Sequence, residues 1–262
     1  MKTSTTSPRK KTGLIGRVMP RAAAALFWLA VWQGLSWLIG QEILLVSPVI
    51  AVRTLWRMAL TPAFYSAVLS SFGRILMGFT AATALGVLLA CAAAASRGVK
   101  TLLEPLMHAI RATPVASFVI LALIFIRARR LSVFISFLMV LPVMYQNALA
   151  GIGAADQKLL EMARVFRVSR ARTALSVRAA AFYPHFLSAC TVSLGICWKA
   201  GVAAEVIGLP DGSIGDALYR AKLYCATPEV YAWTLAIVLL SLGFEKAVLA
   251  LARLAGRTLG EE

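Results

Sequence analysis

The stretch YSAVLSSFGRILMGFTAATALGVLLACAAAA, residues Tyr65 to Ala95, decides the fold class of this chain. It contains a single charged residue, Arg74, among apolar and small side chains. A helix needs about 20 apolar residues to cross a hydrocarbon core about 30 Å thick, and this run is longer than that. Its glycines would let neighbouring helices approach closely in lipid. We therefore expect a transmembrane helix that packs tightly against other helices.

The overall composition requires several such helices. The chain has 262 residues, of which 60% are hydrophobic, and a mean hydropathy of +0.80. Soluble domains contain about 45–50% apolar residues, and one globular core of this size cannot hide the excess. The apolar surface must face lipid or other apolar helices. The sequence therefore predicts an all-α, polytopic membrane helical bundle.

Further apolar runs give about six transmembrane helices in total. They cover Ala22–Gly40, Ala112–Ile126, Leu131–Ala155, Ala179–Ala204 and Val230–Leu251. The run Ala112–Ile126 is shorter than a full span, so it is either a short span or a re-entrant segment. Between the first two spans, the more polar Gln41–Ala63 is typical of an external loop that leads into a short amphipathic helix.

The basic residues indicate how the chain is oriented. The net charge is +16, and 18 of the 27 Lys and Arg residues fall in the N-terminal tail, the loop 96–114, the segment 156–178 and the C-terminal end. Loops rich in Lys and Arg remain in the cytoplasm, so both termini are expected there, in a bacterial plasma (inner) membrane. Arg127, Arg129 and Arg130 are an exception, because this topology places them outside. The sequence contains no basic patch interleaved with aromatic residues, so nucleic-acid binding is not expected.

The tails frame one transmembrane domain. Residues 1–21 are expected to form a cytoplasmic N-terminal tail, 22–255 the membrane domain, and 256–262 a short cytoplasmic tail. The first apolar run has no small-residue cleavage site after it, so we expect an uncleaved span rather than a signal peptide.

The sequence shows no catalytic constellation. It has no G-x-x-x-x-G-K-[ST] loop for nucleotide phosphates. Its four cysteines form no CxxC pair, and its two histidines are far apart, so no metal site is expected. We therefore expect no catalytic residues, no cofactor and no enzyme activity in this chain.

The segment 151–186, GIGAADQKLLEMARVFRVSRARTALSVRAAAFYPHF, follows the fourth apolar run and is mostly polar. Within it, apolar residues at helical spacing could form one face of a short helix. Such a face could dock on a soluble partner, or it could bind anionic lipid.

This segment resembles the cytoplasmic EAA loop of ATP-binding-cassette (ABC) importer permeases, which carries a Glu-Ala-Ala triplet, a later Gly and an apolar-Pro pair. Glu161, Met162 and Ala163 match the triplet, and Tyr183-Pro184 matches the pair. Two positions depart from the pattern: Met162 replaces Ala, and Arg167 stands where Gly is usual. The flanking sequences, including RGVKTLLEPLMHAIRATPVASF and WKAGVAAEVIG, are similar to the nitrate/sulfonate/taurine-type permeases.

The resemblance implies a type I-like permease fold, with a translocation path for a small, anionic or zwitterionic solute. It also implies separate ATPase subunits, an extracytoplasmic solute-binding protein and a second permease copy in a homodimer within the lipid bilayer. The expected ATPase-coupling residues are Leu160, Glu161, Met162, Ala163, Val165, Phe166 and Arg167.

Two charged residues, one in the fifth apolar run and one directly after it, are candidates for the translocation path. Lys199 lies well inside this run, where an unpaired charge is costly, so it could face the path of an anionic solute. Alternatively it pairs with a carboxylate such as Glu205 or Glu245, or extends towards the membrane surface. Glu205, at the end of the run, is the second candidate.

Two other functions remain open at this stage. A stand-alone secondary transporter often shows internal repeats, and none is visible here. The basic segment would also have no role in such a transporter. The other alternative is a membrane-bound enzyme or scaffold, and no reactive constellation is visible for it.

Overall fold

The computed structural model describes residues 14–257, and this part of the chain consists of helices and turns without a strand. The helices are α1 (Leu14–Ile39), α2 (Pro48–Ala59), α3 (Pro62–Ala95), α4 (Arg97–Ala112), α5 (Val115–Phe125), α6 (Ala128–Gly153), α7 (Gln157–Val165), α8 (Arg170–Thr173), the π-helical turn η1 (Ala174–Arg178), α9 (Ala179–Gly208), α10 (Ile214–Leu223) and α11 (Thr227–Arg257). The expected all-α membrane bundle is confirmed.

Helices α3, α6 and α9 form the centre of the bundle, with α6 packed against both of the others. The absence of side chains at two positions allows this close packing. A Cβ atom on Gly78 of α3 would lie 2.5 Å from the carbonyl oxygen of Val133 on α6. One on Gly201 of α9 would lie 2.6 Å from the hydroxyl of Ser136, also on α6. Small residues thus bring three backbones together, as expected for helices packed in lipid.

Helix α11 covers one side of this centre through aromatic packing. Phe244 of α11 meets Phe72 of α3 edge to face, with ring centroids 5.1 Å apart. Trp198 of α9 lies beside both rings and is almost fully buried. Large aromatic side chains bury extensive apolar area and prefer such tilted arrangements.

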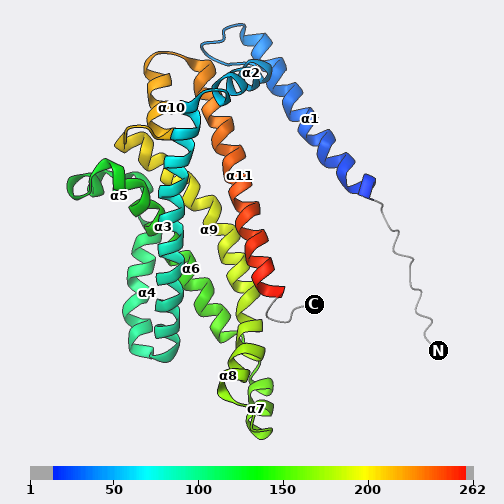
Figure 1. The fold of residues 1–262 in the computed structure, drawn as a ribbon, viewed down its shortest axis with the longest axis vertical. Coiled ribbons are helices and arrows are strands. Elements are labelled where there is room, and N and C mark those ends of the chain that lie inside the picture. The colour runs from blue at the N-terminus through cyan, green and yellow to red at the C-terminus, as the bar shows by residue number, and fades with distance from the viewer. Residues whose placement is uncertain (1–13, 258–262) are drawn as a thin grey trace, which may run out of the picture.

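Figure 1 shows that the molecule has two distinct ends. Helices α2 and α10 lie at one end, and α7 and α8 project from the other. Helix α1 leans away from the bundle and meets it near its C-terminal end, where the indole of Trp32 donates a 3.0 Å hydrogen bond to the carbonyl of Val46. The expected amphipathic helix after the first span is confirmed as α2, which begins at Pro48 and is capped by Ser47.

Four of the described helices are long and apolar enough to cross a membrane. They are α3, α6, α11 and the stretch Ser176–Gly208 that includes α9. A fifth span is obtained if α4 and α5, which are bent by 103° relative to one another, count as one broken span. The apolar part of α1, Ala23–Ile39, is shorter than these. The structure therefore supports four or five spans, and a sixth remains a prediction.

The region between the second and fourth expected spans differs most from the prediction. Residues 96–114 were expected to form a loop, but most of them form α4, which runs back along α3 and α6. Its apolar side faces the bundle, with Met107 and Ile110 buried. Helix α5 has only 11 residues, about 17 Å at 1.5 Å per residue, which is too short to cross a membrane alone. The structure thus favours a broken or re-entrant segment over a short straight span.

Two other boundaries differ from the expected ones. The connection 205–229, between the fifth and sixth expected spans, contains the last turn of α9 and all of α10. Helix α1 begins at Leu14, so it takes up part of the expected tail 1–21. Residues 1–13 and 258–262, which contain the rest of both expected tails, lie outside the described residues.

Candidate coupling helix and charged sites in the bundle

Helix α7 lies at the projecting end of the molecule, where α6 turns towards α9 (Figure 1). Asp156 is its N-cap, and its carboxylate accepts a 2.9 Å hydrogen bond from the backbone N–H of Lys158. Asp is among the preferred residues at this position because its side chain satisfies a free backbone donor. The polar segment expected from the sequence therefore starts with a well-defined helix.

The end of α7 shows how Arg167 replaces the usual Gly. Arg167 has a φ of +53°, in the left-handed region that favours glycine. The N–H of Arg167 donates to the carbonyl of Arg164 at 3.0 Å, and the N–H of Val168 donates to that of Ala163 at 2.9 Å. These two bonds form a Schellman motif, in which the residue after the C-cap is usually Gly. The sharp turn is therefore kept, with an arginine in the strained position.

The outer face of α7 is apolar and exposed. Met162, Val165 and Phe166 have 53%, 78% and 73% of their surface exposed, and Leu159 beside them is also exposed. Glu161 lies on the same exposed side of the helix. A short helix that projects from the bundle with these side chains uncovered presents an interaction surface.

The structure separates the coupling candidates into buried and exposed residues. Ala163 is buried, and Leu160 is partly buried. Both line a cavity of about 530 Å³ between α7 and the segment of α8 and η1, together with Arg164 and Arg178. Leu160 and Ala163 therefore face the following segment across this cavity, whereas Glu161, Met162, Val165, Phe166 and Arg167 are exposed.

Glu205 lies at the centre of a buried polar cluster, with no exposed surface. Its carboxylate accepts a 2.6 Å hydrogen bond from the hydroxyl of Ser71, a 3.4 Å bond from the N–H of Gly215, and one of 3.3 Å from the guanidinium of Arg74. The Ser71 hydroxyl in turn accepts from the N–H of Ile214 at 2.9 Å. This cluster connects α3, α9 and α10, and a buried charge requires such partners. Sequence reasoning missed it, because its members on α3 are more than 100 positions from those on α9 and α10.

Lys199 lies on a different side of α9 from Glu205. Six positions separate them, about 240° around the helix. Lys199 is exposed, and among the described residues its amine forms neither an ion pair nor a hydrogen bond. The alternative, a pairing of Lys199 with Glu205 or Glu245, is therefore not found among these residues, and the two path candidates do not come together.

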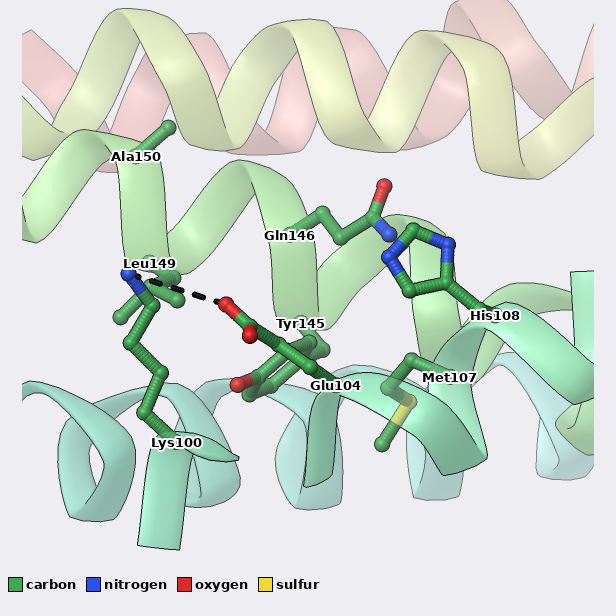
Figure 2. A pocket seen from close by; sticks show the side chains of 8 residues that line it. All are labelled: Lys100, Glu104, Met107, His108, Tyr145, Gln146, Leu149 and Ala150. Carbon is green, nitrogen blue, oxygen red and sulfur yellow. Dashed lines mark ion pairs between the residues drawn. The ribbon is translucent and has the colours of Figure 1, made fainter. Parts of the chain in front are cut away.

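A small pocket lined by both polar and apolar residues lies between α4 and α6. Figure 2 shows Lys100 extended towards Glu104, at 3.7 Å, with His108 and Gln146 facing one another at the far side. The pocket has a volume of about 350 Å³. Tyr145 lies along it, and its buried hydroxyl has no hydrogen-bond partner among the residues described. The expected loop 96–114 thus contributes a polar lining that its sequence alone did not indicate.

The end of the bundle opposite α7 carries a capped helix, α10. Ser213 caps it, accepting a 3.0 Å hydrogen bond from the N–H of Asp216. The Asp216 carboxylate accepts a 2.9 Å hydrogen bond from Nε of Arg220. This hydrogen bond and the negative charge of Asp216 raise the pKa of Arg220. Within residues 14–257 no group of three His, Cys, Asp or Glu could hold a metal ion.

The geometry defines a class of protein: a helical membrane protein with a glycine-packed centre and a short amphipathic helix projecting from one end. Residues 82–259 match the family of binding-protein-dependent transport system inner membrane components. The match covers more than half of the chain, and the chain belongs to this family. It is therefore a permease component of an ABC importer, and its own part in the system is transport rather than catalysis.

Several curated proteins are similar to the chain over most of their length. The nitrate import permease protein NrtB of Synechococcus elongatus is 25% identical over 214 residues, covering 78% of this chain and 76% of NrtB. The putative aliphatic sulfonates transport permease protein SsuC of Bacillus subtilis is 27% identical over 240 residues, covering 88% and 84%. The taurine transport system permease protein TauC of Escherichia coli is 26% identical over 185 residues, covering 70% and 67%.

Proposed function

We propose that two copies of this chain form the translocation path for a small anionic solute, driven by ATPase subunits that dock on α7. A solute-binding protein delivers the solute at the opposite end, and both termini lie in the cytoplasm. ATP hydrolysis belongs to the partner subunits. This chain contributes the translocation path and the surface on which the ATPase subunits act.

The single observation that carries the coupling role is the exposed face of α7. Met162, Val165 and Phe166 are uncovered at the projecting end, next to Glu161. This arrangement fits a helix that docks in a groove on a soluble partner, with apolar contact in the middle and a carboxylate for oriented polar contact. The Schellman turn at Arg167 fixes the C-terminal end of α7. A movement of the partner is therefore transmitted to α9 through a short connection.

The class of solute is proposed from the relatives. Their names include nitrate, aliphatic sulfonates and taurine, of which nitrate and sulfonates are anions and taurine is a zwitterion carrying a sulfonate.

The proposal can be tested by reconstituting the permease with its ATPase and binding protein in proteoliposomes. We expect Glu161→Ala and Phe166→Ser to abolish binding-protein-stimulated ATP hydrolysis and uptake, while the permease keeps its size-exclusion profile. Arg97→Gln is the matched control, because Arg97 is an exposed charge at the α3–α4 corner, outside α7. Coupled hydrolysis at the parental rate in both α7 variants would contradict the docking role.

The orientation has a separate test. Reporter domains fused before Met1 and after Glu262 should both report the cytoplasm. A cytoplasmic report from one end and a periplasmic report from the other would mean an odd number of spans. In that case α4 and α5 would form a re-entrant pair, or α1 would not cross.

A further inference from the structure

A cavity of about 1340 Å³ lies between α3 and α6, at the corner where α5 ends and α6 begins. Four arginines line it: Arg74 from α3, and Arg127, Arg129 and Arg130 from the start of α6. No acidic residue is part of its lining. We refer to it as the arginine cavity.

The positive charge of this cavity is largely uncompensated by the protein. Among the residues described, Arg127, Arg129 and Arg130 take part in no ion pair. Arg74 pairs with Glu205 through one nitrogen, Nη1, at 3.3 Å. A guanidinium has five N–H donors, so the cavity retains many unused donors. Arg127, Arg129 and Arg130 are all exposed in the protomer, so these donors are open to a ligand that enters the cavity.

The position of the arginine cavity also calls for a reason. Helix α6 runs from Ala128 to Gly153 and leads directly into the segment that ends in α7. Its 26 residues place Arg127 about 39 Å from the α7 end of the helix. If α7 lies in the cytoplasm, the three arginines lie on the outer side, against the usual bias of Lys and Arg towards the cytoplasm. Their presence there therefore does not follow from the topology of the chain.

We propose that the arginine cavity binds the oxyanion group of the transported solute at its entry to the path. This rests on the proposed function, since it assumes that the chain conducts an anion. Arginine suits this role because its planar fork of donors matches the oxygens of a nitrate, sulfonate or carboxylate, with two hydrogen bonds from one side chain.

The apolar part of the wall narrows the class of ligand. Phe125, Phe134 and Phe137 line the cavity together with Met77. Phe125 is 86% exposed in the protomer, so its ring is free for contact. An anion with a flat or partly apolar body, such as nitrate or a short alkanesulfonate, can contact these rings while its oxygens bind the guanidinium groups. A strongly hydrated divalent anion would fit this wall less well.

The headgroup of an anionic lipid carries the same oxyanion chemistry, but the cavity favours a free solute. Arg74 has a side chain only 12% exposed, and its partner Glu205 is fully buried. The binding groups therefore extend from the exposed α5–α6 corner inward to Arg74, at the edge of the packed centre of α3, α6 and α9, which a small solute can reach.

The test measures anion binding to the full transporter in nanodiscs of uncharged phosphatidylcholine. The probes are nitrate, methanesulfonate and ethanesulfonate, with dimethyl sulfone as the neutral counterpart. We expect at least one anion to bind with a Kd below about 10 mM and the sulfone not to bind.

The variant R127Q/R129Q/R130Q should weaken anion binding about tenfold or more. The variant R127K/R129K/R130K, which keeps the charge, should restore part of the affinity. R53Q/K222Q, which removes two exposed charges outside the cavity, should bind as the parent does.

Two results would overturn the inference: parental anion affinity in R127Q/R129Q/R130Q, or no binding of any probe. A parallel set of nanodiscs containing phosphatidylglycerol separates solute from lipid. If the arginines control retention of this lipid and leave anion affinity unchanged, the cavity is a lipid site and the inference is wrong. Uptake distinguishes the two levels of the proposal. If R127Q/R129Q/R130Q keeps the parental KM for uptake while Glu161→Ala still loses coupling, the arginine cavity is not the anion site and the proposed function stands.

Discussion

The guanidinium of Arg74 on α3 lies 3.3 Å from the carboxylate of Glu205 on α9, and Glu205 has no exposed surface. Ser71 and Gly215 complete the set of donors around this carboxylate. The ion pair therefore joins two central helices to α10 at one point. Arg74 also lines the arginine cavity, so Glu205 positions a residue that we propose to contact the solute.

Removing only one member of this pair should be more damaging than removing both. Glu205→Leu leaves Arg74 without its carboxylate, and breaking a buried ion pair costs about 3–5 kcal/mol. Arg74→Leu/Glu205→Leu removes both charges, and apolar replacements of a buried pair are often close to neutral. We expect the thermal midpoint to fall clearly in Glu205→Leu and to recover in the double variant. Fluorescence-detected size exclusion after heating measures both. Equal losses in the single and double variants would show that the pair does not stabilise the fold.

The packing of α3 against α6 can be tested at two glycines of the same helix. A Cβ on Gly78 would lie 2.5 Å from the backbone carbonyl of Val133 and 2.8 Å from Cβ of Ser136, neither of which can move without shifting α6. Overpacking of this kind costs about 1–3 kcal/mol. Gly73→Ala is the matched control, because nothing lies within 4 Å of its added Cβ. Gly78→Ala should lower the thermal midpoint, and Gly73→Ala should leave it unchanged or raise it.

The strained arginine at the end of α7 gives a prediction with an unusual sign. Arg167 has a φ of +53°, a conformation that costs a residue with a side chain about 1 kcal/mol more than glycine. Arg167→Gly should therefore stabilise the turn, and Arg167→Val should weaken it, because β-branched residues tolerate this region poorly. Hydrogen exchange of the peptide 157–168 measures the effect locally. Arg164→Gly serves as the control, since glycine inside a helix destabilises it by about 1 kcal/mol. Faster exchange in Arg167→Gly than in the parent would contradict the assignment of the turn.

The helical membrane fold could be predicted from the sequence because a long uncharged apolar run is most stable when it crosses a bilayer as a helix. The runs that form α3, α6, α9 and α11 were located to within a few residues. Helix α4 was missed because it is amphipathic and short, with Pro105 inside it, a pattern that is also typical of a loop between two spans. The bend of 103° between α4 and α5 depends on packing against α6 and α9, which no local pattern reveals.

Candidate sites could be predicted only where their residues are close in sequence. The EAA-like segment is continuous, so its position and its apolar face follow from the local pattern. The cluster of Ser71, Arg74 and Glu205 combines positions more than 100 residues apart, and no local pattern connects Arg74 with its partner. For the arginine cavity, the one signal in the sequence is that Arg127, Arg129 and Arg130 violate the charge bias. This signal identifies the three arginines but does not indicate that they line a cavity.

The last prediction concerns Lys199, which is exposed on α9 and unpaired among the residues described. A lysine that holds no partner contributes no compensation to the fold, so Lys199→Met should leave the thermal midpoint unchanged. If this face of α9 borders the path, the positive charge lowers the electrostatic cost of moving an anion through a low-dielectric passage. We therefore expect Lys199→Met to reduce anion uptake in proteoliposomes and Lys199→Arg, which keeps the charge, to retain it. Loss of stability in Lys199→Met would instead indicate a structural contact with a second copy of the chain. Unchanged uptake and unchanged stability together would show that the side chain only extends to the membrane surface.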